Sequence, residues 1–184
     1  MKRILTISVL ALCLMSLCLL PSLGLAASKT HSFDDPLRAY TAYLNQNMAL
    51  RSGPGTNYTE LGTYGQNTPI VLYEKEIGGS VTWGMVEFRG NGGLIRAYTG
   101  MKRIDTDTAD IPWANTVTYV STLQSDLVPR RGPGSEYAPC NKVLYRGTRL
   151  LLYHEERGYV MADFYFQGDS KLTRAWIPVS ALIN

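Results

Sequence analysis

The sequence contains the same short stretch twice. Residues 51–58 are RSGPGTNY, and 79 positions later residues 130–137 are RRGPGSEY. Glycine reaches backbone angles that other residues avoid, and proline fixes its own φ at about −65°, so each Gly-Pro-Gly specifies a sharp bend. A chain that repeats a bend in this way is predicted to fold the same unit twice.

The similarity continues on both sides of the bend. Tyr40 aligns with Tyr119 and Leu44 with Leu123 at the same offset of 79. Three later segments align at other offsets. IVLYEKE from Ile70 aligns with LLLYHEE from Leu150 at an offset of 80, and WGMVEF from Trp83 aligns with YVMADF from Tyr159 at 76. Leu94 and Ile95 align with Trp176 and Ile177 at 82. Loops tolerate insertions better than strands do, so these changes of offset should fall in loops.

Each copy has the composition of short β-strands. RAYTAYL and TVTYVST are rich in β-branched and aromatic residues, and TWGMVEFR and GYVMADFYF alternate between two faces. Turn-forming segments lie between them, and Gly-Asn-Gly-Gly at residues 90–93 predicts a tight hairpin. Closure of such strands into a barrel removes exposed edges, so we predict an all-β protein of two tandem small five-stranded barrels.

The order of these segments resembles the bacterial SH3-like (SH3b) domain family. MALRSGPGTNYTELG is followed by an apolar strand, then by TWGMVEF, and then by GLIRAYTGM. The resemblance covers about residues 38–103 and 117–184 and implies two SH3-like barrels. The second copy departs from the family pattern beside the bend at Pro129 and Arg131, at Tyr159 in the tryptophan position, and at Ala175 in the position of the last glycine.

The amino-terminal segment predicts export. Lys2 and Arg3 precede a long apolar run, Pro21 ends this run, and small residues follow at Ala26 and Ala27. Cleavage after Ala27 would leave no membrane span, whereas a retained anchor is the alternative interpretation of the apolar run. We therefore expect a periplasmic or extracellular protein associated with the cell envelope.

The repeat and the signal divide the chain into five parts. We expect a signal peptide at 1–27, a disordered leader at 28–37, a first barrel at 38–104, a linker at 105–116 and a second barrel at 117–184. Trp113 stands alone in the acidic linker. A tryptophan in this setting packs onto a neighbouring domain, so we expect Trp113 to fix the orientation of the two barrels.

Charge and cysteine content exclude two classes of protein. After signal cleavage 16 of the 18 Lys and Arg residues remain against 15 Asp and Glu, which gives no electrostatic case for nucleic-acid binding. Cys140 is the only cysteine after the signal, so no internal disulfide framework is expected. We predict that Cys140 is a small buried apolar residue.

Residues for catalysis or metal binding are scarce. The two histidines are His31, in the leader, and His154, whose repeat equivalent Glu74 suggests an exposed strand face rather than a catalytic triad. No histidine or cysteine pair has metal-ligand spacing, and DTDTAD at 105–110 lacks the glycine and the final glutamate of a calcium loop. We predict no enzyme activity, no metal and no cofactor. A small cell-wall hydrolase is the least favoured alternative, because a filled small barrel offers little room for a polysaccharide cleft.

Aromatic side chains supply the candidate binding surface. The family likeness places them around the groove of each barrel: Tyr58, Tyr64, Trp83 and Tyr98 in the first copy, and Tyr137, Tyr145, Tyr159 and Trp176 in the second. Such residues contact ligands at low entropic cost. Their alternative role is core packing, which we favour for Trp83 and Trp176.

The bend residues are assigned a structural role. They are Arg51, Gly53, Pro54 and Gly55 in the first copy, and Arg130, Gly132, Pro133 and Gly134 in the second. We expect Gly55 and Gly134 to adopt positive φ. The family likeness implies that the partner is peptidoglycan, through its peptides. An envelope protein that offers an extended peptide is the alternative.

Overall fold

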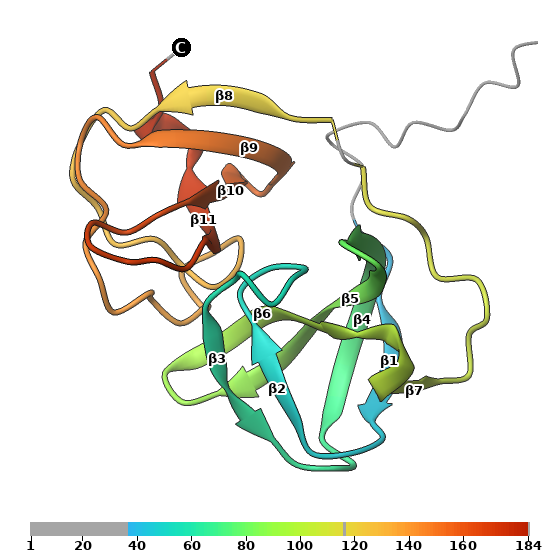
Figure 1. The fold of residues 1–184 in the computed structure, drawn as a ribbon. Coiled ribbons are helices and arrows are strands. Elements are labelled where there is room, and N and C mark those ends of the chain that lie inside the picture. Colours follow the sequence, from blue (N-terminus) through green and yellow to red (C-terminus); the bar gives the residue numbers. More distant parts are fainter. Residues whose placement is uncertain (1–36, 116, 184) are drawn as a thin grey trace, which may run out of the picture. The chain divides into compact units, whose positions relative to one another are not determined.

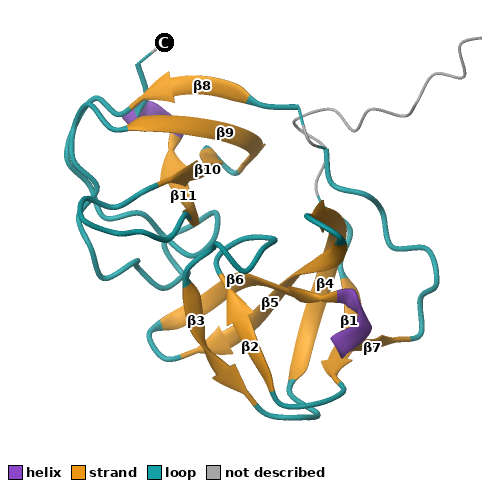
Figure 2. Cartoon of the chain, viewed as in Figure 1, coloured by secondary structure: helices purple, strands orange, loops and turns teal. Residues whose placement is uncertain are grey.

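The computed structural model describes residues 37–115 and 117–183, here called the first lobe and the second lobe (Figure 1). The predicted signal peptide and residues 28–36 of the predicted leader lie outside the described residues. The expected all-β structure is confirmed, since the regular elements are strands apart from two single turns of 3-10 helix (Figure 2). In the described part of the chain, no helix has the length and apolar character needed to cross a membrane.

The first lobe contains one antiparallel sheet of seven strands in the order β3-β2-β6-β5-β4-β1-β7. Its elements are β1 (Tyr40–Leu44), β2 (Met48–Arg51), β3 (Glu60–Tyr64), β4 (Pro69–Gly78), β5 (Val81–Gly90), β6 (Gly93–Gly100), η1 (Met101–Arg103) and β7 (Ile104–Thr106). The predicted hairpin is confirmed, because Gly90 pairs with Gly93 across the turn and Gly92 adopts a φ of 89°.

The second lobe contains a four-stranded antiparallel sheet in the order β11-β10-β9-β8. Its elements are β8 (Tyr119–Thr122), β9 (Arg149–Glu156), β10 (Tyr159–Phe164), β11 (Thr173–Pro178) and η2 (Val179–Ala181). The described chain thus has two sheets, one in each lobe, and neither pairing order returns to its starting strand.

Each lobe has an apolar core of its own. Leu44, Leu50 and Leu72 are fully buried in the first core, and Leu123, Leu144 and Leu150 in the second. Cys140 is part of the second core, and burial raises the pKa of its thiol to about 11. The prediction that Cys140 is a buried apolar residue is therefore confirmed.

The bends need glycine for a reason other than the expected one. Gly55 and Gly134 are not among the residues with positive φ, so that expectation was wrong. At Gly53 and Gly132 a Cβ atom would instead overlap the ring of Tyr58 or Tyr137, which folds back over the bend of its own copy. Arg51 and Arg130 complete the bends. Each guanidinium donates to the backbone carbonyl of the tyrosine of its own copy, at 3.1 and 2.8 Å.

The strand register corrects one part of the repeat alignment. Arg96 lies opposite Glu87 in the first lobe, and Arg174 lies opposite Asp163 in the second. The equivalent segments are therefore RAY at 96–98 and RAW at 174–176, at an offset of 78. The alignment of Leu94 and Ile95 with Trp176 and Ile177 was wrong, because it matched hydrophobic character and passed over the arginine.

The linker is shorter than predicted and is tied to the first lobe. Asp105 and Thr106 belong to β7, which pairs with β1. Further along, Lys75 donates its backbone N–H to Pro112 and accepts from Ala114, at 2.8 and 2.9 Å. Trp113 is 53 % exposed and lies over the ammonium of Lys75. It does not pack between the lobes as expected, because this main-chain pairing holds it against the edge of β4.

The close approach of Gly53 to Tyr58 generates a prediction. We expect Gly53→Ala to lower the free energy of unfolding by about 1–3 kcal/mol, since the added methyl group must displace a buried ring. Gly65→Ala is the control, because its Cβ would meet nothing closer than 3.8 Å. Denaturant unfolding of both variants measures the difference, and equal midpoints would refute the steric explanation.

Candidate functional site

The two bends lie against each other's lobes in a two-fold arrangement. In the first lobe, Thr59 donates its backbone N–H to Leu172, and Leu172 donates back to Asn57, at 2.8 and 3.1 Å. In the second lobe, Ala138 donates to Leu94 and Leu94 donates back to Glu136, at 2.9 and 3.1 Å. The four hydrogen bonds thus form two equivalent pairs. The residues that the first copy contributes to one pair are the equivalents of those that the second copy contributes to the other.

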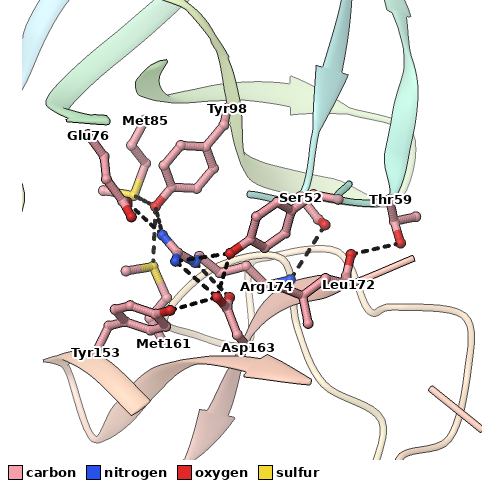
Figure 3. A network of polar contacts seen from close by, with 11 residues as sticks. Ser52, Thr59, Glu76, Met85, Tyr98, Tyr153, Met161, Asp163, Leu172 and Arg174 are labelled. Atoms are coloured by element: carbon pink, nitrogen blue, oxygen red, sulfur yellow. Dashed lines mark hydrogen bonds and ion pairs between the residues drawn. The ribbon is translucent and has the colours of Figure 1, made fainter. Parts of the chain in front are cut away.

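Arg174 is the centre of one buried polar cluster (Figure 3). Its guanidinium donates to both oxygens of Asp163 in its own lobe, at 2.7 and 3.0 Å, and to Glu76 of the first lobe at 2.6 Å. Tyr58 of the first lobe donates its hydroxyl to the same Asp163 at 2.5 Å. The ring of Tyr153 covers the guanidinium at 4.0 Å. Two carboxylates and a ring therefore hold the arginine across the contact between the lobes.

Arg96 is the centre of the equivalent cluster on the other side. Its guanidinium donates to Glu87 in its own lobe at 3.0 Å and to both oxygens of Glu156 in the second lobe, at 2.6 and 3.1 Å. Tyr137 of the second lobe donates its hydroxyl to Glu87. The ring of Tyr73 lies 4.5 Å from the guanidinium. Every group of the Arg174 cluster except Tyr98 thus has a chemically similar counterpart.

Tyr98 and Trp176 are the point at which the two clusters differ. The Tyr98 hydroxyl accepts a hydrogen bond from Arg174 at 3.3 Å and lies 3.4 and 3.5 Å from the sulfur atoms of Met85 and Met161. Trp176 fills the equivalent position and presents its ring to Arg96 at 5.3 Å. The Tyr98 ring also lies 5.4 Å from the Arg174 guanidinium, so both sides have a cation–π contact, and the difference is the Tyr98 hydroxyl, which Trp176 lacks.

Burial and the arginines set the ionisation of these clusters. Burial raises the pKa values of Tyr58, Tyr98 and Tyr137 well above the usual range, and that of Tyr153 to about 12, so these hydroxyls remain neutral donors. Burial alone would raise the pKa of Glu156, but His154 and Arg96 lower it to about 2. Burial would lower the pKa values of Arg96 and Arg174, but their hydrogen-bonded and charged neighbours raise them, so each guanidinium stays charged, as a buried ion pair requires.

Glu74 and His154 are repeat equivalents that lie near each other inside the contact. The sequence suggested an exposed face, but Glu74 is only 6 % exposed because the second lobe covers it. Burial raises the pKa of Glu74 to about 7, even though His154 acts in the opposite direction. The nearest acid to the His154 ring is Glu156, at 3.8 Å from Nε2.

The contact between the lobes accounts for half of the eight aromatic residues expected to bind a ligand. Tyr58 and Tyr137 are 7 % and 4 % exposed, and Trp83, Tyr98 and Trp176 are also buried. Tyr64 and Tyr159 are partly buried, and Tyr145 is 50 % exposed in the second lobe. We expected these side chains to flank open grooves. The structure instead directs four of them into the other copy, because their hydroxyls and rings complete the arginine clusters.

An open cleft in the first lobe is one candidate binding site that the structure leaves accessible. It has a volume of about 680 Å³ and is lined by Trp83 and Trp113, by the apolar side chains of Val81 and Met101, and by the cations Lys75, Lys102 and Arg103. The Trp83 indole N–H donates to Gly78 at 3.3 Å, which fixes the ring as a wall of the cleft. The arrangement combines exposed apolar surface with positive charge.

Sequence reasoning missed the two arginines and their glutamate partners. Their signal was present in the repeat, since Arg96 and Arg174 each precede alanine and an aromatic residue, and Glu76 and Glu156 align at the offset of 80. A repeated charged residue inside an apolar strand indicates a buried ion pair. In the described residues there is no group of three or more His, Cys, Asp or Glu side chains placed to hold a metal ion.

Comparison of the chain with protein-family models, with curated proteins and with solved structures returns no match.

The Arg174 cluster generates a stability prediction. We expect Arg174→Gln to lower the free energy of unfolding by about 3–5 kcal/mol, because Asp163 and Glu76 lose their counter-charge while staying buried. Arg96→Gln should have a similar effect. Arg157→Gln is the control, since Arg157 and its partner Glu136 are both exposed and such pairs contribute little. Urea unfolding measures all three, and a loss at Arg174 no larger than at Arg157 would contradict this account.

Glu74 generates a pH prediction. A carboxyl whose pKa is higher in the folded chain stabilises the fold below its unfolded pKa of 4.5, and this contribution is lost as pH rises through about 7. We expect stability to fall by up to about 3 kcal/mol over that range through Glu74, which also faces His154, Glu76, Arg96 and Arg174.

The test is Glu74→Gln, which keeps the shape of the side chain and removes the titration. Unfolding free energies at pH 5 and pH 7.5 should differ less in this variant than in the unaltered protein, whereas Glu60→Gln, at an exposed position, should leave the difference unchanged. An unaltered pH dependence in Glu74→Gln would show that this carboxyl does not titrate in that range.

Proposed function

We propose that the chain is an exported, non-catalytic binding protein of the cell envelope. In this proposal it consists of two tandem five-stranded SH3-like barrels and holds peptidoglycan through its peptides. The observation that carries the proposal is the cleft of the first lobe, where exposed apolar surface and positive charge lie together.

The proposed barrel family is supported by the order of elements. Both copies contain, in sequence, a first strand, the Gly-Pro-Gly bend, three consecutive strands of which the last contains Arg-Ala-aromatic, and one turn of 3-10 helix. This order matches the SH3-like resemblance of the sequence. The signal-like segment at 1–27 supports export.

The proposed ligand follows from the chemistry of the cleft. Trp113 and Met101 offer apolar surface, and Lys75, Lys102 and Arg103 offer positive charge at the rim. Peptides of peptidoglycan carry free carboxylates and short aliphatic side chains, which suit these two features. The proposal therefore moves the contact surface from Tyr58 and Tyr137, which are buried, to the cleft.

Binding to purified peptidoglycan tests the proposal. We expect Trp113→Ala to reduce the fraction of protein that sediments with the wall material and to weaken binding about tenfold, because a half-exposed tryptophan typically contributes more than 1 kcal/mol to an interface. Lys102→Glu should weaken binding as well, since it reverses one rim charge. Tyr165→Ala and Arg146→Glu are the matched controls, at exposed positions of the second lobe outside the cleft.

Three results would contradict the proposal. They are equal retention of Trp113→Ala and Tyr165→Ala, retention only from an envelope protein extract and not on purified wall, and release of soluble sugar or peptide from the wall. The second result would favour the adaptor alternative, and the third would indicate a hydrolase.

A further inference from the structure

The linker shows how an extended segment binds to the edge of one of these lobes. Residues 111–114, here called the strap, run parallel to β4 and pair with both backbone groups of Lys75. Ile111 is buried in the first core, and Trp113 lies 4.7 Å from the Lys75 ammonium. The strap is therefore held by main-chain pairing, by one buried aliphatic residue and by one contact to the side chain at position 75.

The second lobe has an equivalent edge at Glu155. Glu155 aligns with Lys75 in the repeat, and it pairs with Val160 of β10 as Lys75 pairs with Gly84 of β5. Strand β8 pairs with β9 only as far as Leu152, and strand β1 pairs with β4 only as far as the equivalent Leu72. The backbone groups of Glu155 consequently face outward, and no backbone hydrogen bond to them from that side is found among residues 37–115 and 117–183.

An apolar hollow lies beside this edge. It has a volume of about 230 Å³, and its walls include Leu152, Val160, Val179 and Leu182 together with Glu155. The equivalent region of the first lobe is closely packed, since a Cβ on Gly84 would lie 2.8–2.9 Å from Leu72, Met101 and Ile104. The second lobe therefore offers an edge that no other described residue pairs with, and a place for one aliphatic side chain.

We propose that the Glu155 edge binds an extended segment of another protein, in which an aliphatic residue is followed two positions later by lysine or arginine. The segment runs parallel to β9 as the strap runs parallel to β4, and its aliphatic side chain fills the hollow. Its basic side chain pairs with the exposed Glu155 carboxylate, because the charge at this position is opposite to that of Lys75.

Charge distinguishes this occupant from the protein's own leader. The offset of 79 that aligns the start of the two copies places Phe33, Asp34 and Asp35 at the positions of Pro112, Trp113 and Ala114. An aspartate at the position of Trp113 would meet Glu155, a residue of like charge. A basic segment from a partner avoids this repulsion.

Three labelled hexapeptides test the proposal. They are DIPRAN, which is the strap with arginine in place of Trp113, its charge-reversed form DIPEAN, and the leader sequence HSFDDP. We expect the exported chain to bind DIPRAN at least about tenfold more tightly than either of the other two in fluorescence anisotropy. DIPRAN should also slow amide hydrogen exchange at Glu155.

Charge reversal at Glu155 completes the test. Glu155→Lys should weaken DIPRAN binding at least about tenfold and favour DIPEAN, whereas Asp107→Lys, which alters an exposed acid of the first lobe, should leave both affinities unchanged. Equal affinity for DIPRAN and DIPEAN, or no slowing of exchange at Glu155, would overturn the proposal. Binding of HSFDDP as tight as that of DIPRAN would assign the edge to the leader and overturn the partner assignment.

Discussion

The structure depends on two buried arginines, each of which is neutralised by carboxylates from both lobes. Arg174 and Arg96 lose most of their hydration, so each requires close acidic partners, and one of these partners always comes from the other copy. A single copy cannot satisfy its own arginine to the same extent. The pairing of the copies, the burial of the tyrosines and the position of the bends follow from this requirement.

The sequence predicted the content of each copy better than the relation between the copies. The bends, the hairpin at residues 90–93 and the burial of Cys140 depend on local composition and could be inferred directly. The role of Gly53 could not, because it depends on a ring that folds back from Tyr58. The burial of Tyr58 and Tyr137 was equally inaccessible, since their partners Asp163 and Glu87 lie in the other lobe. Hydrophobic periodicity shows which face of a strand is buried. It does not show that the buried faces of two copies pack against each other.

The copies match at the two arginines and at their carboxylate partners. Inside the same contact, Glu74 corresponds to His154 and Tyr98 to Trp176. Away from the contact, Lys75 corresponds to Glu155 and Gly84 to Val160. The open cleft and the edge at Glu155 both involve positions of this last kind. A symmetric contact thus leaves the two outer surfaces free to acquire different ligands.

The reciprocal character of the arginine clusters also bears on how chains can exchange parts. The first lobe of one chain carries every group that the second lobe of any other chain requires, and no hydrogen bond to either cluster is found from residues 107–114. Two chains can therefore trade halves and keep all of these contacts, which is the condition for domain swapping. The halves can pair within one chain or between two chains. The choice depends on the protein concentration and on the length of the connecting segment, because the contact itself is the same in both cases.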